Sequence, residues 1–309
     1  MQDSVESLQS GETSASTSHK ARLITTHILQ CLEQHRETGT AEPLMVALQG
    51  PQALLKTLAS PPHNLRVAAF SLDDLYLPHE GLVAVRTSNP GNKLLAGRGL
   101  PGTHDVALGR KLLQDLKTIN GREEGTVLLP IFDKSLFGGE GDRSKVTVTV
   151  QAPLDVVLFE GWSVGFSPLD EQELVARYLK AEQARQESPE TDAPAFLNHS
   201  LDNVKTVNEL LRRTASQLWS FFTVFIQLEV ASLSQIYFWR LEQEHAMMAQ
   251  NGGIGMTDEQ VKVFVDRYLP GYELWMDGIK TGTYAQQWKG RGLSLVYSAG
   301  REVLQVRHF

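Results

Sequence analysis

The sequence predicts an α/β fold built on a doubly wound, mainly parallel sheet. Three observations lead to this prediction. Short, nearly continuous apolar runs recur along the chain, as in strands that are covered on both faces. Segments with helical spacing separate these runs, and polar residues directly follow several of them. We therefore expect one layered domain with a helical lid region.

The apolar runs predict a sheet of about five strands. Four strands should be central, at residues 43–50, 65–71, 154–160 and 221–228. A fifth run covers residues 293–297, and residues 302–306 suggest an edge pair with it. The spacing of apolar residues predicts helices at 20–37, 106–119, 171–187, 201–216, 234–250 and 258–268.

The composition is that of an ordinary globular domain and argues against several classes of protein. Of 309 residues, 29 are Lys or Arg and 36 are Asp or Glu, which gives a formal net charge of −7. An acidic chain is a poor binder of nucleic acid or anionic membranes, and no stretch reaches the ~18 apolar residues of a membrane span. Cys31 is the single cysteine, so no intrachain disulfide or thiolate metal cluster can form.

Residues 1–19 differ from the rest of the chain, because they are rich in Ser and Thr and contain no arginine. We expect a disordered tail there rather than a secretory or mitochondrial leader. Residues 20–309 are expected to form a single domain. The cytoplasm is the expected compartment, with the nucleus as an alternative.

Acidic residues stand at the ends of two predicted strands. Asp73 and Asp74 follow the run 65–71, and Glu160 ends the run 154–160. In open α/β sheets the ligand binds beyond the carboxyl ends of the strands, so these carboxylates should meet there. The pattern predicts Mg²⁺ and phosphate chemistry. The alternative is that each acid caps a turn or lies in a solvated loop.

A phosphate-binding loop is only partly present after the first strand. Gly50, Lys56 and Thr57 are in register with G-x-x-x-x-G-K-[ST], but Leu55 stands where the second glycine belongs. The following helix is short, because Pro61-Pro62 interrupts it. The residues by themselves favour another interpretation, in which 53–59 is a helix remnant and the match of Lys56 and Thr57 is chance.

Two loops carry further charged residues. Residues 98–105 form a Pro- and Gly-containing loop that displays Arg98, His104 and Asp105, either toward a ligand or as the cap of the next helix. Residues 133–143 form a glycine-rich loop with Lys134 and Arg143, which either closes over an anionic substrate or is a plain surface turn.

One further arginine and three histidines are candidates for a role in the site. Arg240, in the helix predicted at 234–250, either reaches phosphate or lies on a solvated face. The spacing of His63, His79 and His199 does not indicate a zinc site.

Several short motifs together resemble one family over most of the chain. They are Pro61-Pro-His-Asn-Leu-Arg66, Ser71-Leu-Asp-Asp-Leu-Tyr-Leu77, Arg98-Gly-Leu-Pro-Gly-Thr-His-Asp105, Asp133-Lys-Ser135 with Gly141-Asp-Arg143, Glu160-Gly-Trp-Ser-Val-Gly-Phe166 and the segment 237–247. From about Leu44 onward the chain resembles the fungal ATP-dependent kinases of the glycerate kinase-like group. This group is part of the P-loop kinase superfamily, with uridine kinase, phosphoribulokinase and pantothenate kinase. The resemblance implies a P-loop NTPase-like fold and phosphoryl transfer from ATP, with Mg²⁺, to a small hydroxylated acceptor such as D-glycerate.

The resemblance also implies roles for individual residues. Asp73 matches the candidate general base, and Arg143 and Arg240 match lid or substrate cations. Asp74 and Glu160 are expected to hold Mg²⁺. The remaining expected contacts are Gly50, Gln52, Lys56 and Thr57 for ATP, and Arg98, His104, Asp105 and Lys134 for the acceptor.

The phosphate loop departs from the family pattern. Relatives continue after Gly-Pro/Val-Gln with Gly-x-Gly-Lys-Ser/Thr and a full helix, whereas this chain passes from Gln52 to Ala53-Leu-Leu-Lys-Thr-Leu-Ala-Ser60. On the order of ten residues, about three helical turns, are absent from this chain by comparison. A skipped exon or an error in the gene model would produce this difference, and so would a true loss of activity. In the second case the alternative function is a catalytically crippled kinase-fold protein or a binding module.

Overall fold

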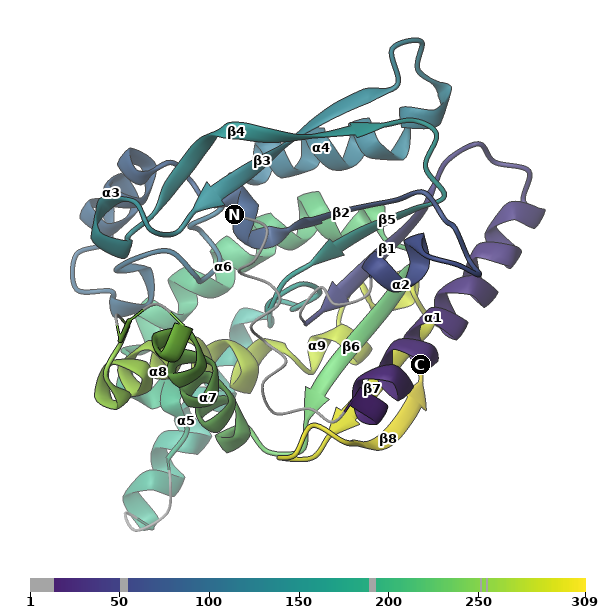
Figure 1. Ribbon diagram of the computed structural model, residues 1–309. Helices are drawn as coiled ribbons and strands as arrows, with labels where there is room; N and C mark the ends of the chain where they lie inside the picture. Colours follow the sequence, from purple (N-terminus) through teal and green to yellow (C-terminus); the bar gives the residue numbers. More distant parts are fainter. Residues whose placement is uncertain (1–13, 51–54, 189–192, 251, 254) are drawn as a thin grey trace.

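A six-stranded sheet forms the centre of the computed structural model, which describes residues 14–50, 55–188, 193–250, 252–253 and 255–309 (Figure 1). The strand order is β2–β5–β1–β6–β7–β8; the first five strands are parallel, and β8 runs antiparallel to β7. The strands are β1 (Leu44–Gln49), β2 (Val67–Ser71), β5 (Val156–Glu160), β6 (Val224–Val230), β7 (Gly292–Tyr297) and β8 (Val303–His308). The predicted doubly wound, mainly parallel fold is confirmed.

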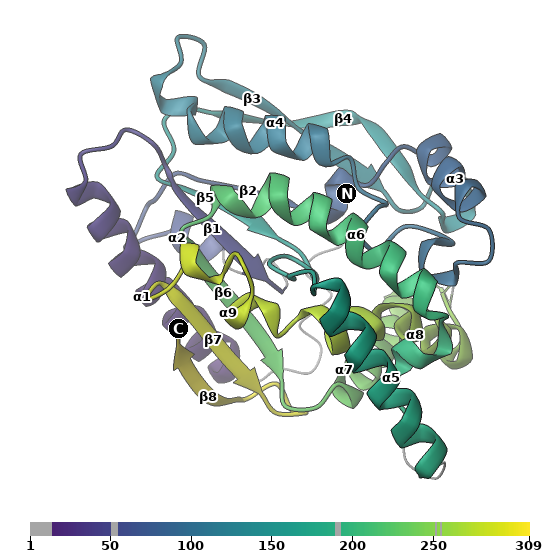
Figure 2. The ribbon, with the colours of Figure 1, turned by 180° about the vertical axis from the view of Figure 1, so that it is seen from behind.

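Helices cover both faces of the sheet. The helix α1 (Ser14–Glu37) and the short α2 (Leu55–Ala59) lie over one face, where Ile28 and Leu58 pack against alternate residues of β1 and β6 (Figure 1). On the other face lie α4 (Val106–Lys117), α6 (Leu201–Leu218) and α9 (Gly278–Thr281) (Figure 2). All six residues of β1 are therefore buried, which explains its continuous apolar run.

The remaining elements lie mostly beside the carboxyl ends of the parallel strands. On that side of the sheet Figure 1 shows α3 (His79–Ser88), α7 (Ser234–Gln250) and α8 (Asp258–Trp275). A separate antiparallel hairpin, β3 (Thr126–Asp133) and β4 (Asp142–Gln151), crosses above the sheet in the same view. The helix α5 (Glu171–Glu187) packs against α6.

The structure corrects two expectations about strands. The strand β2 was expected to be central, but it is the edge strand beside β5. The hairpin β3–β4 was not predicted, and the expected loop 133–143 is shorter, because its ends belong to these strands. Residues 126–129 alternate between exposed and buried, which is the pattern of an antiparallel strand with one face in water. The prediction of strands from the sequence relied instead on continuous apolar runs, the pattern of strands that are buried on both faces.

Two helices are longer than predicted. The helix α1 begins at Ser14, inside the stretch expected to be a disordered tail, whereas residues 1–13 lie outside the described part of the chain. The helix α8 was expected to end at Tyr268 but continues through Pro270 to Trp275. A proline inside a helix costs about 3 kcal/mol, and burial of Leu274 and Trp275 compensates for it.

No helix in the described residues is both long and apolar enough to cross a membrane.

Gly165 supports a first prediction, on packing between the loop after β5 and the sheet. Its φ is +81°, and a Cβ there would lie 2.3 Å from Cε2 of Phe225 on β6. Gly39 has a similar φ of +72° with no atom within 4 Å of such a Cβ. Gly165→Ala should therefore cost about 2–5 kcal/mol of unfolding free energy, from backbone strain plus overpacking, and the control Gly39→Ala about 1–2 kcal/mol, from strain alone.

Urea unfolding of both variants measures this difference. Equal losses in the two variants would show that Gly165 is not needed for close packing on Phe225.

Candidate active site

The predicted acidic residues come together at the carboxyl ends of β2 and β5. Ser71 ends β2 and pairs in register with Glu160, the last residue of β5. A 3₁₀ turn, η2 (Leu72–Leu75), follows Ser71 at once and carries Asp73 and Asp74. The charges of both aspartates act on Glu160, so the three carboxylates form one cluster.

Asp74 ties the turn to its surroundings. Its Oδ2 accepts a hydrogen bond from the Ser71 amide at 3.4 Å, while Ser71 Oγ accepts one from the Asp73 amide at 3.1 Å. Its Oδ1 accepts the amide of Phe132 on β3 at 3.0 Å, which fixes the hairpin to the end of β2. Burial raises the pKa of Asp74 above its ordinary value, against the effect of these hydrogen bonds. Both oxygens of Asp74 therefore have backbone partners.

Asp73 forms the ion pair at the centre of the cluster. Nζ of Lys134, at the tip of the hairpin, lies 2.6 Å from Asp73 Oδ2. Burial raises the pKa of Asp73, but the charge and the hydrogen bond of Lys134 outweigh burial, so this pKa lies below its ordinary value. The Tyr76 side chain also hydrogen-bonds Asp73 and lowers its pKa, whereas Oδ1 of Asp73 is buried and has no partner at hydrogen-bonding distance and angle among the described residues. At neutral pH the site therefore contains a charged carboxylate with one oxygen left for a ligand.

Glu160 holds its proton more tightly than an ordinary glutamate. Burial raises its pKa to about 7, a hydrogen bond from the Ser71 side chain opposes this, and the negative charges of Asp73 and Asp74 add to it. A cation beside these carboxylates would relieve the repulsion and replace the proton.

The loop 98–105 packs against the acidic turn through His104. The His104 ring stacks on Tyr76, with centroids 4.6 Å apart, and the two residues form an isolated β-bridge. Burial lowers the pKa of His104 to about 4, against the raising effect of Asp73, so the imidazole is neutral at pH 7. Both ring nitrogens are buried and have no hydrogen-bond partner among the described residues. A neutral imidazole offers one donor and one acceptor to a ligand.

The other residues expected from this loop have structural contacts. Asp105 caps α4 by accepting the Leu108 amide at 3.0 Å, and its Oδ2 lies 3.1 Å from Arg143 Nη2. Arg143 also donates to the Tyr76 carbonyl, whereas its Nε has no described partner. The structure thus shows Asp105 as a helix cap and as the ion-pair partner of Arg143.

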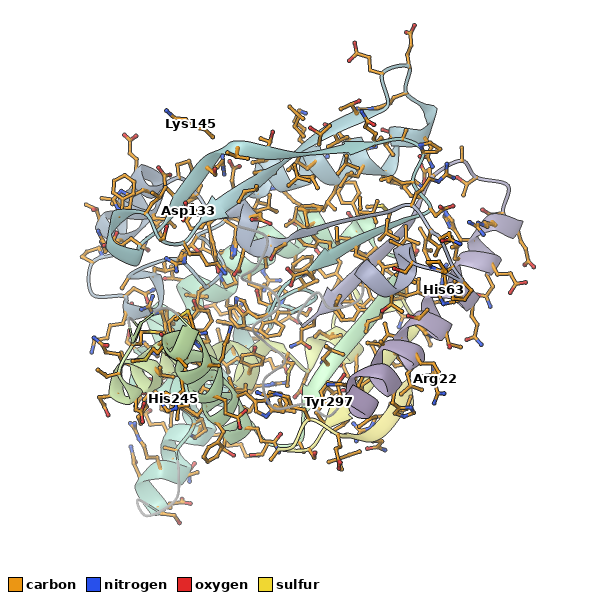
Figure 3. All side chains as sticks on the ribbon, in the orientation of Figure 1. Arg22, His63, Asp133, Lys145, His245 and Tyr297 are labelled. Carbon is orange, nitrogen blue, oxygen red and sulfur yellow. The ribbon has the colours of Figure 1, made fainter. Side chains whose placement is uncertain are left out.

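Arg98 holds the loop between β3 and β4. It donates to the carbonyl groups of Gly139 and Glu140, and the Glu140 carboxylate lies 3.0 Å from His79 Nε2. Figure 3 labels Asp133 at the end of β3, where its carboxylate accepts from Ser135 and so caps the start of this loop. The loop that carries Lys134 is therefore anchored on several sides.

Arg240 reaches the same region from α7. Its guanidinium pairs with Glu244 at 2.7 Å and lies over the ring of Phe264 at 5.1 Å. Its charge lowers the pKa of Tyr268, a tyrosine on α8 whose pKa burial and Asp73 raise to about 12. The charges of Arg240 and Asp73 therefore shift the pKa of the Tyr268 hydroxyl in opposite directions.

The expected ATP-binding residues lie at the end of β1, where part of the chain is not described. Gly50 has a φ of +141°, and a Cβ there would lie 2.6 Å from Cδ1 of Leu228, so glycine suits this position. Gln52 lies outside the described residues. Lys56 and Thr57 belong to α2, which has five residues, and the placement of the Lys56 side chain is not described.

Sequence reasoning missed two residues at this edge of the sheet, Gln49 at the end of β1 and Trp162 after the end of β5. Gln49 Nε2 donates to the Trp162 carbonyl at 3.3 Å, whereas the buried Gln49 Oε1 and Trp162 Nε1 have no partner among the described residues. The motif that contains Trp162 marked the segment, but it did not show that the indole nitrogen is unpartnered.

Comparisons with known proteins identify relatives of the chain. No protein-family model matches the chain. The chain is 34% identical to the probable ATP-dependent kinase TDA10 of Saccharomyces cerevisiae over 257 residues, 78% of this chain and 80% of the yeast protein. It is 32% identical to the chloroplastic D-glycerate 3-kinase of Arabidopsis thaliana over 244 residues, 76% of this chain and 48% of the plant protein. The solved structure of a D-glycerate 3-kinase from Cryptococcus neoformans matches with a TM-score of 0.88 and 41% identity, over 94% of this chain and 99% of that chain.

The buried, neutral His104 makes stability depend on pH. Between pH 6.5 and pH 4 the unfolded chain binds a proton at this residue and the folded chain does not, so stability falls as the pH falls. At pH 5 the loss from this residue is about 2 kcal/mol. His104→Phe keeps the stack on Tyr76 and should reduce the loss between pH 8 and pH 5 by about this amount.

Urea unfolding at both pH values measures the effect, with His63→Phe on the partly exposed His63 as the control (Figure 3). An unchanged pH profile in His104→Phe would contradict the assignment of a neutral, buried His104.

Proposed function

The chain belongs to the glycerate kinase-like family of ATP-dependent kinases with a P-loop fold, and from this membership we propose that it transfers the terminal phosphoryl group of ATP to a hydroxyl group of a small acceptor. D-glycerate is the acceptor that we place first, because the Arabidopsis and Cryptococcus relatives are named for it. The acidic chain favours a metabolite over nucleic acid as the partner. The cytoplasm or nucleus is the proposed compartment.

The observation that carries this proposal is the group of unpartnered polar atoms around Asp73. Asp73 Oδ1, both ring nitrogens of His104 and Nε of Arg143 are buried and lack partners among the described residues. An unpartnered buried polar atom costs about 1–3 kcal/mol, so several at one place indicate a surface made for a polar ligand. Carboxylate, imidazole and guanidinium together suit a small molecule that bears hydroxyl and carboxylate groups.

In this proposal Asp73 orients the acceptor hydroxyl and takes its proton. The acceptor oxygen forms a bond to the γ-phosphorus while the bond to the leaving ADP breaks. The transition state of phosphoryl transfer is loose, so catalysis depends mainly on positioning and charge. A charged Asp73 held by Lys134 suits positioning, and Arg143 and Arg240 supply positive charge near the transferred group. Arg98, Lys134, His104 and Asp105 form the proposed acceptor side of the site.

The carboxylate cluster fits a magnesium ion. The described residues contain no group of three or more His, Cys, Asp or Glu side chains that could hold a metal, but Mg²⁺ in kinases takes one or two carboxylates together with the phosphates. Glu160, whose raised pKa a bound cation would lower again, fits this need, while Asp73 Oδ1 is left for the acceptor hydroxyl. Asp74, the other proposed ligand, would add a metal contact to its two backbone bonds. When bound, Mg²⁺ neutralises phosphate charge during transfer.

The proposed ATP contacts are Gly50, Gln52, Lys56 and Thr57. The sequence after β1 also favours a second candidate function, a catalytically crippled binding module, because Leu55 stands where the second glycine of a phosphate loop belongs. Loss of several backbone N–H bonds to phosphate would remove several kcal/mol of ATP affinity, about tenfold for each 1.4 kcal/mol.

Asp73→Asn should reduce phosphoryl transfer to D-glycerate by about 10²- to 10⁴-fold in kcat, because the amide cannot take the proton. Radiolabelled ATP with D-glycerate measures the rate. Asp115→Asn, at a surface aspartate of α4 paired with Lys111 and Arg122, is the control and should retain activity. Full activity in Asp73→Asn would contradict the role assigned to Asp73.

Calorimetric titration of Mg·ATP separates the two candidate functions. The kinase predicts micromolar binding that weakens at least tenfold in Lys56→Ala and not in the control Lys111→Ala. If Mg·ATP does not bind, or if Lys56→Ala does not weaken its binding, the result would favour the crippled binding module.

A further inference from the structure

Trp162, Tyr268, Phe166 and Tyr272 form a cluster of aromatic rings, here called the aromatic wall. Trp162 follows the end of β5, and its ring contacts Tyr268 edge-to-face, with centroids 4.9 Å apart and an interplanar angle of 77°. The Trp162 ring also meets Phe166 at 5.4 Å and Tyr272 at 5.4 Å. A Cβ on Gly271 of α8 would lie 3.1 Å from the Trp162 ring, so the helix backbone also packs closely against it. The indole is therefore held in one orientation.

The indole N–H of Trp162 is buried and has no hydrogen-bond acceptor among the described residues. In contrast, the indole nitrogens of Trp219 and Trp288 donate to the carbonyl groups of Phe166 and Ile279 at 2.9 and 2.8 Å. An indole N–H can only donate, so Trp162 requires an acceptor atom that the described chain does not provide.

Tyr268 brings a second donor to the same wall. The glycine at position 99 leaves room for it, because a Cβ there would lie 2.6 Å from the Tyr268 hydroxyl oxygen. That hydroxyl lies 3.5 Å from the Arg98 carbonyl, which is at the limit of a hydrogen bond. Its pKa of about 12 reflects first burial and then the charge of Asp73, so the hydroxyl keeps its proton at neutral pH.

The charges that act on the wall are mixed, with the carboxylate of Asp73 on one side and three arginines on the other. Arg98, Arg240 and Arg267 all act on the Tyr268 hydroxyl and lower its pKa. Arg240 has the carboxylate of Glu244 as a partner, whereas Arg98 donates to carbonyl groups and keeps its full positive charge there. Two neutral donors beside an uncompensated cation match a carboxylate group.

We propose that Trp162 Nε1 and the Tyr268 hydroxyl bind the carboxylate of a short hydroxy acid and so select it over an uncharged polyol. This inference rests on the proposed acceptor site, but it concerns binding and does not require transfer. Neither residue touches the reacting hydroxyl in this assignment. They determine specificity, and Asp73 remains the group that orients the hydroxyl.

The test uses variants that remove one donor and keep the ring. Trp162→Phe and Tyr268→Phe should each weaken D-glycerate binding by about 10- to 100-fold in calorimetry without ATP, the effect of one hydrogen bond to a charged group. In kinetics KM should rise more than kcat falls. Glycerol, which lacks the carboxylate, should bind no more weakly to the variants than to the wild type.

Matched controls separate this role from a structural one. Trp288→Phe and Tyr178→Phe remove donors whose partners are carbonyl groups of the chain itself, at 2.8 and 2.9 Å. These controls should lower the melting temperature and leave D-glycerate affinity unchanged. Trp162→Phe leaves a comparable cavity but loses no internal hydrogen bond, so it should lower the melting temperature less than Trp288→Phe does.

The outcomes also separate this inference from the kinase proposal. If wild type binds D-glycerate without phosphorylating it, the kinase proposal fails and the binding comparison still decides this inference. Unchanged D-glycerate affinity in both wall variants would overturn it. So would wild-type protein that binds neither D-glycerate nor another short hydroxy acid.

Discussion

The parallel register of β2, β5 and β1 is the constraint on which the rest of the site depends. It sets Ser71 beside Glu160 and Glu160 beside Leu48, so that three strands end at one edge of the sheet. The chain then turns at once into η2, which leaves Asp73 and Asp74 at the same edge. Three carboxylates this close repel one another, and the raised pKa of Glu160 is one result, after burial itself. The cluster needs positive charge, which Lys134 supplies in part.

The parts that supply this charge are held by contacts outside the sheet. The hairpin is tied to the turn by Asp74 and Phe132, and its tip places Lys134 on Asp73. The loop 98–105 joins through the stack of His104 on Tyr76. The polar atoms that remain unpartnered are thus surrounded by groups that are themselves fixed. A ligand can therefore bind there without ordering the site first, which lowers the entropic cost of binding.

The sequence was sufficient for the strands of the main sheet and for the acids at its edge, because buried parallel strands and strand-end carboxylates are local patterns, but it did not give the order of the strands, in which β2 is at the edge. It did not predict the hairpin, whose half-exposed strands alternate. It could not show that Asp74 bonds to Phe132, 58 residues away, or that Arg98 donates to the hairpin loop. The wall of Trp162 and Tyr268 joins segments more than a hundred residues apart, and only packing brings their donors together. Long-range contacts, rather than residue types, therefore decide which polar atoms have hydrogen-bond partners within the described chain and which do not.

The central claim is that the group of unpartnered atoms around Asp73 binds a small hydroxy acid. A crystal structure of the chain with D-glycerate, Mg²⁺ and a non-hydrolysable ATP analogue tests it most directly. The account predicts an acceptor hydroxyl within hydrogen-bond distance of Asp73 Oδ1 and a carboxylate on the wall formed by Trp162 and Tyr268. D-glycerate bound elsewhere, with Asp73 Oδ1 still without a partner, would contradict it.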